Sequence, residues 1–210
     1  MDFISSILRF EIGDWWKEED LPLDYKKFGN FLKLNVEVGF GSGEFITSFA
    51  TSNQKDLFVG IEVYGEGLRK VVKKIKEEKI ENILPLCGDA YVVMQVAFED
   101  ESLDSIFINF PDPWPKKRHK DRRLLKDEFF LLCKRKLKRK GTLYFSTDDE
   151  NLALFADLEI KKVDEMKNSN SPYPYIHEPI YPYKTKYEKK FLEEGKKIFY
   201  FLYEREDASH

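Results

Sequence analysis

The alternation of short apolar runs with amphipathic stretches constrains the fold of this sequence more than any other feature. Five apolar runs, the third including the loop that follows it, are predicted to be strands: residues 33–38, 56–63, 82–90, 103–110 and 141–147. Between the second and third runs, apolar residues fall at i, i+3, i+4 and i+7 from Leu68, which predicts a helix with outward lysines. Strands and helices that alternate at this spacing predict βαβ units, and therefore an α/β fold on a mostly parallel sheet.

Further helices are predicted at three short segments and one longer one: residues 46–53, 90–98, 149–158 and Arg122–Lys138. Residues 171–183 contain four prolines, which excludes a regular element, and a helical turn or two and a final aromatic strand follow at residues 190–205. A chain of 210 residues suits one domain with appendages. We expect residues 33–210 to form that domain and residues 1–32, which match no motif, to be a lead-in segment.

The charges are distributed unevenly along the chain. The net charge of −3, from 35 Lys+Arg and 38 Asp+Glu, argues as an average against a nucleic-acid partner. Residues 114–140, however, carry 13 basic and 3 acidic side chains, whereas residues 1–113 carry 12 basic and 21 acidic ones. Such a basic block is usually a solvated helix face, but beside a ligand site it predicts a phosphate-binding track.

Other features of the sequence limit where in the cell the protein can be located and whether it can bind a metal. No run approaches the roughly 18 apolar residues of a membrane span, and the N-terminus lacks the basic start and long apolar run of a signal peptide. Cys87 and Cys133 are isolated thiols, which suit a reducing compartment. The three histidines lie far apart, so we expect no metal site. These features predict a cytoplasmic protein without membrane contact.

The first predicted strand runs into a glycine-rich turn with an E-x-G-x-G-x-G pattern formed by Glu37, Gly39, Gly41 and Gly43. The glycines permit a tight turn and a close approach of the backbone to a ligand. The pattern differs from the G-x-G-x-x-G of dinucleotide-binding folds, where a pyrophosphate meets a helix N-terminus. An acidic residue here would repel a phosphate but suits a cationic or amino-bearing ligand. A glycine turn without a ligand remains the alternative.

Two more carboxylates follow the next two predicted strands. Glu62 ends the second strand and is suited to accept hydrogen bonds from ribose hydroxyls, and Asp89 follows the third, where it can accept one from an adenine amino group. Each of them alone is more often a solvated residue or a helix cap. Together with Glu37 they point to a ribose and an adenine without a phosphate, which indicates S-adenosylmethionine rather than NAD or ATP.

The fourth predicted strand leads into residues 109–119, which read NFPDPWPKKRH. Two prolines flank Asp112 and fix the direction of its carboxylate. Seven basic residues follow within residues 114–126, which begin the basic block. Behind Asp112 and beside a cofactor site, this block is predicted to bind phosphates.

These segments together resemble the bacterial tRNA (guanine-N7)-methyltransferases over roughly residues 33–205. The matching segments are Glu37–Gly43, Glu62, Gly88–Ala90, residues 110–119, Ser146–Asp148 and Thr185–Glu188. The resemblance implies methyl transfer from S-adenosylmethionine to N7 of a variable-loop guanine, position 46 of tRNA, with S-adenosylhomocysteine as product. It also implies a Rossmann-like class I methyltransferase fold with seven strands, helices on both faces and an antiparallel C-terminal strand.

The resemblance further implies a role for each matching residue. Asp112 takes the catalytic position and lines the cofactor pocket. The other cofactor contacts it implies are Glu37, Gly39, Gly41, Gly43, Glu62, Asp89 and Ala90. The contacts with the guanine and its nucleotide that it implies are Lys116, Asp148, Thr185, Lys186, Tyr187 and Glu188. We expect Asp112 or Asp148 to accept hydrogen bonds from the guanine N1–H and 2-amino group, and the protein to act on tRNA as a monomer or homodimer.

Structural alternatives stay open at several of these positions. Asp148 or Asp149 can cap a helix, and Thr185 and Glu188 have the spacing of a capping box. The tyrosines within residues 171–183 are expected to pack in the loop rather than to stack on bases. Trp15 and Trp16 are either a core anchor or an RNA-facing patch.

Competing functions differ in what they require. A methyltransferase for a small molecule or for another RNA would give a different methylated product. A non-catalytic RNA-binding module would bind S-adenosylmethionine weakly or not at all. An NAD-linked oxidoreductase is excluded by the glycine spacing and by the lack of an acid/base pair for hydride transfer.

Overall fold

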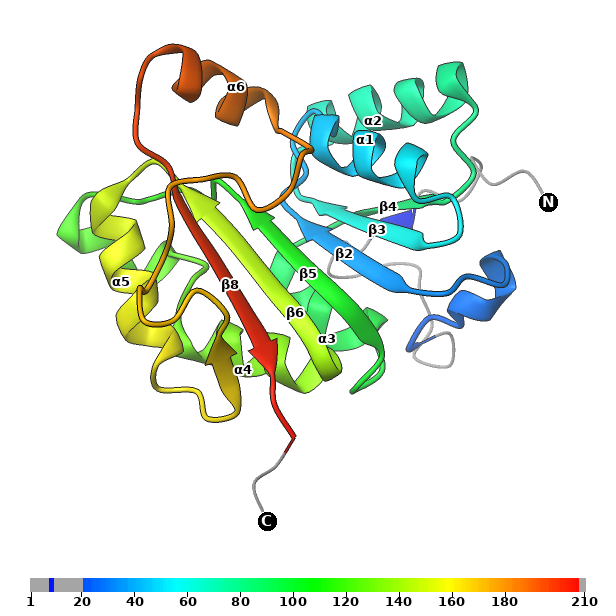
Figure 1. The fold of residues 1–210 in the computed structure, drawn as a ribbon. Helices are drawn as coiled ribbons and strands as arrows, with labels where there is room; N and C mark the ends of the chain where they lie inside the picture. Colours follow the sequence, from blue (N-terminus) through cyan, green and yellow to red (C-terminus); the bar gives the residue numbers. More distant parts are fainter. Residues whose placement is uncertain (1–7, 10–20, 208–210) are drawn as a thin grey trace.

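Eight strands form one sheet, in the order β1-β4-β3-β2-β5-β6-β8-β7, in the computed structural model, which describes residues 8–9 and 21–207 (Figure 1). The strands are β1 (Leu8–Arg9), β2 (Leu34–Val38), β3 (Leu57–Glu62), β4 (Ile83–Cys87), β5 (Leu103–Asn109), β6 (Leu137–Thr147), β7 (Met166–Asn168) and β8 (Phe199–Arg205). The pairs from β1 to β6 are parallel, and β8 is antiparallel to both β6 and β7. The predicted α/β fold with an antiparallel C-terminal strand is confirmed.

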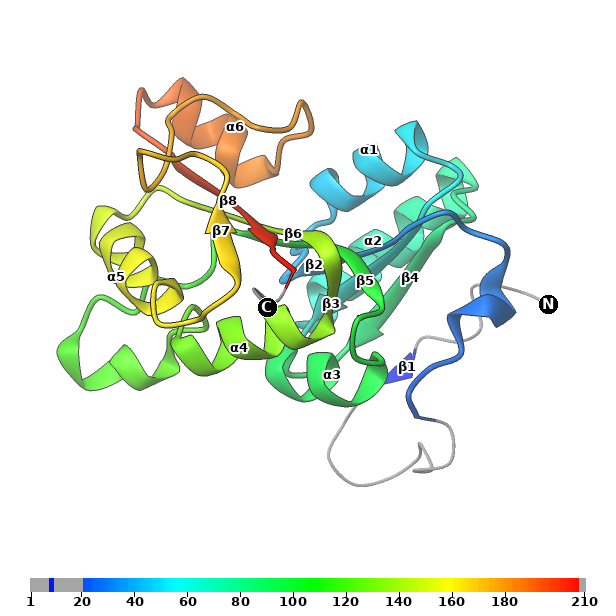
Figure 2. The same cartoon turned by 60° about the horizontal axis from the view of Figure 1, so that its bottom comes forward.

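The seven strands predicted for residues 33–210 are β2 to β8, and the lead-in segment adds β1 as an eighth strand of the sheet. β1, two residues of the lead-in segment, pairs with Leu86 and Cys87 of β4 at one edge of the sheet, and β7 forms the other edge (Figure 2). A strand of two residues has no apolar alternation of its own, so the sequence contains no signal for it.

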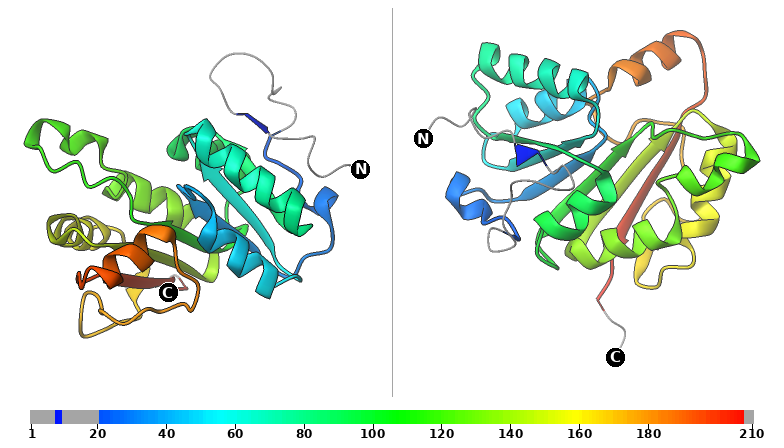
Figure 3. Two further views of the ribbon diagram at one scale, coloured as in Figure 1. Left: turned by 90° about the horizontal axis from the view of Figure 1, so that it is seen from above. Right: turned by 180° about the vertical axis from the view of Figure 1, so that it is seen from behind.

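Helices cover both faces of the sheet, and alternate side chains along each strand pack against the helices of opposite faces. The helices are α1 (Glu44–Ser52), α2 (Gly65–Glu78), α3 (Ala90–Ala97), α4 (Asp127–Lys136), α5 (Glu150–Ile160) and α6 (Lys186–Glu193). Ile106 and Ile108 of β5 belong to the core cluster with α3, α4 and α5, whereas Phe107 between them belongs to a cluster with α1 and the segment before α6. Figure 3 shows α3 and α4 against the face that Figure 1 leaves behind the sheet.

The helix predicted at Arg122–Lys138 is shorter than expected. A 3-10 helix, η3, occupies Lys117–Arg122, and α4 begins only at Asp127 and ends at Lys136. The backbone enters α4 at Lys126 without a side-chain cap, and β6 starts directly at Leu137 without a turn residue. Both boundaries therefore lack the sequence signals that mark a helix end.

The proline-rich segment 171–183 crosses the sheet face in front of β5 and β6, as Figure 1 shows, with one isolated bridge at Ile176. Tyr183 stacks on Phe49 of α1 at 4.5 Å between ring centroids, and Tyr181 packs edge-on against Phe107 of β5 at 5.3 Å. The prediction that the tyrosines of this segment pack within the fold is confirmed for Tyr175, Tyr181 and Tyr183, whereas Tyr173 is 67% exposed. The segment leads into α6, which lies over the upper ends of β6 and β8 in Figure 1.

The described part of the lead-in segment packs on the core. A second 3-10 helix, η2 (Tyr25–Phe28), places Tyr25 flat against Phe98 at 5.3 Å, and the Tyr25 hydroxyl donates to the Ala97 carbonyl at 3.1 Å. The division into residues 1–32 and 33–210 stays a prediction, and Trp15 and Trp16 lie outside the described residues. None of the described helices is long and apolar enough to span a membrane.

Candidate active site at the carboxyl edge of the sheet

The order of the strands reverses between β2 and β5. From β2 the chain continues to β3 and β4 on one side, and it then returns to β5 and β6 on the other side. In open α/β sheets, ligands bind at such a switch point, outside the carboxyl ends of the strands. Apart from Thr185–Glu188 of α6, the residues predicted from the sequence lie at the ends of β2 and β3 or in the segments that follow β2, β4, β5 and β6, so the fold places them along this one edge.

Glu37 lies next to the switch point and is 3% exposed. The side-chain amide of Asn109 on β5 donates from Nδ2 to Glu37 Oε1 at 2.9 Å. Within the described residues, Glu37 Oε2 is buried and has no hydrogen-bond partner. Burial raises the pKa of Glu37 to about 8, and the Asn109 hydrogen bond and the nearby Ile46 amide offset only part of that rise. A buried carboxylate with one oxygen left over is costly unless a ligand completes its hydrogen bonding.

The glycine-rich turn after β2 needs its glycines. Gly39, Gly41 and Gly43 have φ angles of 74°, 55° and 78°, in the left-handed region that other residues rarely adopt. A Cβ added to Gly39 or Gly41 would meet no atom within 4 Å, so open space lies in front of both residues. The turn ends at Gly43, which is the N-cap of α1.

Glu62 holds this turn in place. Its Oε2 accepts a hydrogen bond from the Gly41 amide at 2.8 Å, and its Oε1 accepts from the amides of Val63 and Tyr64, each at 2.9 Å. Glu62 is 6% exposed, and both of its carboxylate oxygens accept hydrogen bonds from backbone amides. Each of its oxygens still has a broad lone-pair region, so an additional hydroxyl donor fits the chemistry.

Gly67 was not singled out from the sequence, although it shapes the same turn. It lies in the first turn of α2, where an added Cβ would be 2.4 Å from the Gly41 carbonyl oxygen and 3.3 Å from Glu62 Cγ. Only a residue without a side chain lets α2 approach the glycine-rich turn this closely. The pair of glycines, Gly65 and Gly67, directly before the apolar pattern that starts at Leu68 was the signal that could have found it.

Asp89 is the N-cap of α3. Its Oδ1 accepts from the amides of Tyr91 at 2.9 Å and Val92 at 3.1 Å, so the helix-cap alternative holds for this residue. Asp89 is exposed, and Ala90 begins the helix beside it. A cofactor contact through the remaining oxygen of Asp89 is compatible with the cap and stays a prediction.

The backbone around Asp112 is strained. Phe110 and Trp114, on either side of it, have positive φ angles of 49° and 41°. Bulky residues adopt this conformation only where the surroundings impose it, commonly at functional sites. Arg123, 6% exposed, donates from Nε to the Pro113 carbonyl at 2.8 Å and so fixes the segment from behind. Asp112 itself is exposed and has no hydrogen bond within the described residues.

Of Asp148 and Asp149, only Asp149 caps a helix. Asp149 caps α5 by accepting from the Leu152 amide at 2.7 Å, which leaves the half-buried Asp148 for another role. Lys196, after α6, donates to Asp148 Oδ2 at 3.2 Å. This contact brings the chain after α6 to the end of β6, close to the predicted guanine-binding residues.

Of the four residues Thr185–Glu188, two stabilise helix α6 and two are exposed. Thr185 caps α6 by accepting from the Glu188 amide at 3.0 Å, and Glu188 is 2% exposed. The Tyr200 hydroxyl donates to Glu188 Oε1 at 2.8 Å, which ties α6 to β8. Burial raises the pKa of Glu188, and the Tyr200 hydrogen bond partly opposes that rise. Lys186 and Tyr187, in contrast, are exposed and available to a substrate.

The structure also divides the basic block 114–140 in two. Lys134, Arg135, Lys136 and Lys138 form ion pairs with acidic neighbours, and Lys136 is only 4% exposed. In contrast, Lys116 and Arg118 are exposed and have no ion pair within the described residues. Arg122 lies over the Trp114 ring, 5.1 Å from its centroid. Unpaired, exposed cations therefore lie directly after Asp112, and Arg139 and Lys140 at the far end of the block are also exposed without an ion pair within the described residues.

The residues present fit S-adenosylmethionine. Gly39 and Gly41, which have open space before them, follow Glu37 by two and four residues, and a sulfonium or an ammonium group suits the spare, buried oxygen of Glu37. Glu62, Asp89 and Ala90 border the same edge. The side chain that holds the glycine-rich turn is a carboxylate, Glu62, which suits a phosphate-free ligand.

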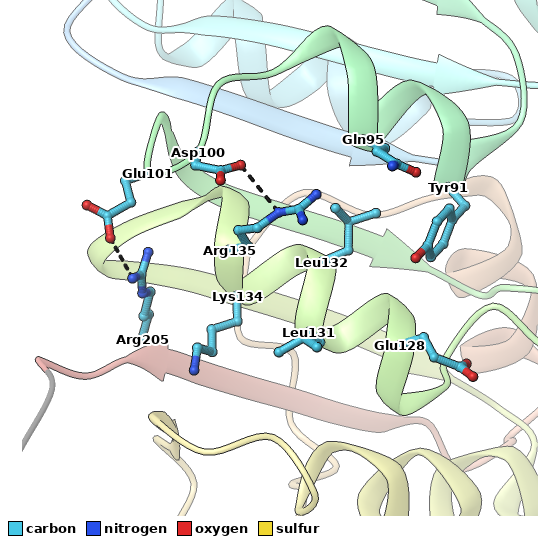
Figure 4. Close-up of a pocket in the computed structure, with 10 residues that line it drawn as sticks. All are labelled: Tyr91, Gln95, Asp100, Glu101, Glu128, Leu131, Leu132, Lys134, Arg135 and Arg205. Carbon is cyan, nitrogen blue, oxygen red and sulfur yellow. Dashed lines mark hydrogen bonds and ion pairs between the residues drawn. The ribbon is translucent and has the colours of Figure 1, made fainter.

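A separate cavity of about 460 Å³ lies between α3 and α4, on the face of the sheet that these two helices cover (Figure 4). Arg135 and Arg205 line it, and each is neutralised by an ion pair, with Asp100 at 3.3 Å and Glu101 at 2.6 Å. None of the residues predicted for the reaction lines this cavity. The candidate site at the switch point and this cavity are therefore separate features of the structure.

Known proteins match the chain over most of its length. The profile of a family described as "Putative methyltransferase" matches residues 32–201. A tRNA (guanine-N(7)-)-methyltransferase of Buchnera aphidicola subsp. Acyrthosiphon pisum is 36% identical over 189 residues, which cover 88% of this chain and 79% of the relative. A protein of the same name from Klebsiella pneumoniae subsp. pneumoniae is 31% identical over 187 residues, 89% of this chain and 78% of the relative.

Solved methyltransferases share the fold. The aminoglycoside resistance methyltransferase NpmB1 superposes with a TM-score of 0.61 over 94% of this chain and 98% of its own, at 14% identity. A SAM dependent methyltransferase from Aquifex aeolicus gives a TM-score of 0.57 over 86% of each chain, at 16% identity. At these identities, the likeness concerns the architecture alone.

Proposed function

Because this chain belongs to the family of the tRNA (guanine-N7-)-methyltransferases, we propose that it transfers a methyl group from S-adenosylmethionine to N7 of a guanine in tRNA. The observation that carries the proposal is the pairing, at the switch point, of a buried carboxylate with a spare oxygen and a glycine-rich turn with open space before it. This pairing suits a cationic nucleoside better than a nucleotide.

The cofactor supplies an electrophilic methyl group on a positively charged sulfur when bound. Glu37 offers its spare oxygen to a cationic part of the cofactor, and Glu62 and Asp89 offer lone pairs to the ribose and the adenine. Gly39 and Gly41 let the backbone approach without steric hindrance. Ala90 follows Asp89 with a side chain of a single methyl group. These contacts account for the preference for S-adenosylmethionine over NAD.

The chain's own residues have to align the guanine rather than activate it. N7 of guanine carries an in-plane lone pair and loses no proton when it attacks, so a general base is unnecessary. Positioning of the two reactants can supply several kcal/mol of the barrier. The purine becomes cationic as the methyl group arrives, and a carboxylate close to the ring stabilises that charge. We assign this role to Asp112, held by the strained segment between Phe110 and Trp114.

Recognition of the guanine falls to residues at the ends of β6 and α6. A carboxylate can accept hydrogen bonds from both the N1–H and the 2-amino group of guanine, a donor pair that adenine does not present there. Asp148 is suited to this role because Asp149 takes over the helix cap. Lys186 and Tyr187 are exposed at the start of α6 and complete the predicted nucleotide contacts, with Thr185 and Glu188 holding α6.

The tRNA backbone meets the first half of the basic block in this proposal. Lys116, Arg118 and Arg122 lie directly after Asp112 and are exposed, so phosphates flanking the target guanine can reach them. We propose the variable-loop guanine at position 46 as the target. Cytoplasmic location and a monomeric or homodimeric state stay predictions.

The proposal is tested by incubating unmodified tRNA transcripts with the protein and isotope-labelled S-adenosylmethionine, followed by mass spectrometry of the nucleosides. We expect labelled 7-methylguanosine as the main product. A different methylated nucleoside would indicate another RNA substrate or another atom. Binding of S-adenosylmethionine without transfer to any RNA would favour the non-catalytic or small-molecule alternatives.

A further inference from the structure

A short row of hydrogen bonds joins three neighbouring strand ends at the switch point. Ser146 on β6 donates from Oγ to Asn109 Oδ1 at 3.2 Å, and Asn109 on β5 donates from Nδ2 to Glu37 Oε1 on β2 at 2.9 Å. The three residues are 0%, 7% and 3% exposed, so the protein shields the row from water. Asn109 and Ser146 are direct partners in the β5–β6 register, which aligns their side chains.

The chemistry of the three groups allows only one orientation when Glu37 is ionised. A carboxylate accepts hydrogen bonds and donates none, so the amide of Asn109 has to turn its NH2 group toward Glu37. The Asn109 carbonyl oxygen then faces Ser146, whose hydroxyl can donate. Ser146 thus keeps the amide from flipping, and Asn109 keeps Glu37 from rotating.

We infer that Asn109 is a positioning residue: it holds Glu37 ionised and fixes its Oε1, so that Oε2 is presented to the cationic part of S-adenosylmethionine. The inference rests on the proposed function. It adds a role for Asn109, a residue to which the family resemblance assigns none. Asn109 would touch neither the cofactor nor the guanine, because its amide is used by Glu37 and Ser146.

The charges around Glu37 make this support necessary. Burial disfavours its ionised form most, and the charges of Glu44 on α1 and Glu62 on β3 add to that effect. The hydrogen bond from Asn109 on β5 and the Ile46 amide on α1 oppose it. With a pKa near 8, Glu37 is only partly ionised at neutral pH in the free protein. The affinity for a cationic ligand should therefore rise about tenfold per pH unit below pH 8 and level off above it.

The test is the variant Asn109→Leu, which keeps the approximate volume and removes the donor. Isothermal titration calorimetry measures its affinity for S-adenosylmethionine and for 5′-methylthioadenosine, the neutral fragment of the cofactor, between pH 6.5 and about 9.5. We expect the affinity for S-adenosylmethionine at pH 7.5 to fall about 10- to 100-fold, as for the loss of a hydrogen bond to a charged group. The pH at which its affinity levels off should move upward, while the affinity for the neutral fragment changes less than about twofold.

Ser105→Ala is the matched control, because Ser105 lies on the same strand and shares a 2.9 Å hydrogen bond with Thr142 of β6 but is not part of the row. It should leave both affinities and the pH profile unchanged. If the leucine variant fails to fold, Asn109→Asp keeps the shape and should weaken S-adenosylmethionine binding in the same selective way.

Equal weakening of both ligands, or an unshifted pH profile in the Asn109 variants, would overturn the positioning role. Wild-type protein that binds no S-adenosylmethionine would instead overturn the proposed function. The two failures are thus distinguishable.

Discussion

Two glycines in the first turn of α2 differ sharply in what surrounds them, and they give the most discriminating prediction. A Cβ at Gly67 would be 2.4 Å from the Gly41 carbonyl oxygen, a backbone atom that cannot rotate away. A Cβ at Gly65 would meet only the flexible end of Arg69, at 3.7 Å from Nη1. Both Gly→Ala changes bring the same improvement in helix propensity, at most about 1 kcal/mol. The difference between them therefore isolates the contact with the glycine-rich turn.

We expect Gly67→Ala to be less stable than Gly65→Ala by about 1–3 kcal/mol, the usual cost of overpacking. For a domain of this size, that difference corresponds to a melting temperature lower by roughly 2–12 °C. The displaced turn also strains the hydrogen bond from the Gly41 amide to Glu62, so S-adenosylmethionine should bind Gly67→Ala at least about tenfold more weakly.

Thermal unfolding followed by circular dichroism and calorimetric titration with S-adenosylmethionine measure both quantities on the two variants. Gly65→Ala should match the wild-type protein or exceed it slightly in stability, with unchanged affinity. Equal melting temperatures and affinities for the two variants would refute the close approach of α2 to the turn, and with it the geometry of the site.

Three further predictions concern other parts of the site. Asp112→Asn should reduce kcat for methyl transfer at least about 100-fold while the melting temperature is retained, and near-normal turnover would exclude Asp112 from the catalytic position. Tyr200→Phe should destabilise the fold by about 1–3 kcal/mol, because Glu188 loses its buried donor. That donor lowers the pKa of Glu188, so its removal penalises the ionised carboxylate, and urea titrations should show a larger loss of stability at high pH than at low pH; a pH-independent loss would contradict this. Lys116→Ala should lower the slope of log affinity for tRNA against log salt concentration by about 1. Lys134→Ala should leave this slope unchanged, because Lys134 is already paired with Glu165. Equal slopes for the two variants would count against the division of the basic block.

The sequence was sufficient for the fold because apolar periodicity reports burial directly. The strand runs at residues 33–38 and 103–110 correspond to β2 and β5, and the helix with its apolar face from Leu68 corresponds to α2. It was not sufficient where boundaries lack a local signal, as at the uncapped start of α4 after Lys126. β1 was missed for the same reason, since a two-residue strand is defined only by its partner, β4.

The site shows a similar division. Residue types and their order after the strands placed Glu37, Glu62 and Asp112 at one edge, because strand ends meet there in any parallel sheet. The sequence could not show that Glu62 binds the backbone of the glycine-rich turn, since that hydrogen bond depends on the packing of the turn against β3. The burial of Glu188 was equally hidden, because its donor, Tyr200, lies on a strand twelve residues later.

The central claim is that the switch-point site methylates one particular guanine of tRNA. It is tested most directly with two transcripts of the same tRNA, one with guanine and one with adenine at position 46, under identical conditions with the wild-type protein. We predict one methyl group per molecule, recovered as 7-methylguanosine at that position, from the guanine transcript, and none from the adenine transcript. Equal methylation of the two transcripts would contradict the assignment of the target.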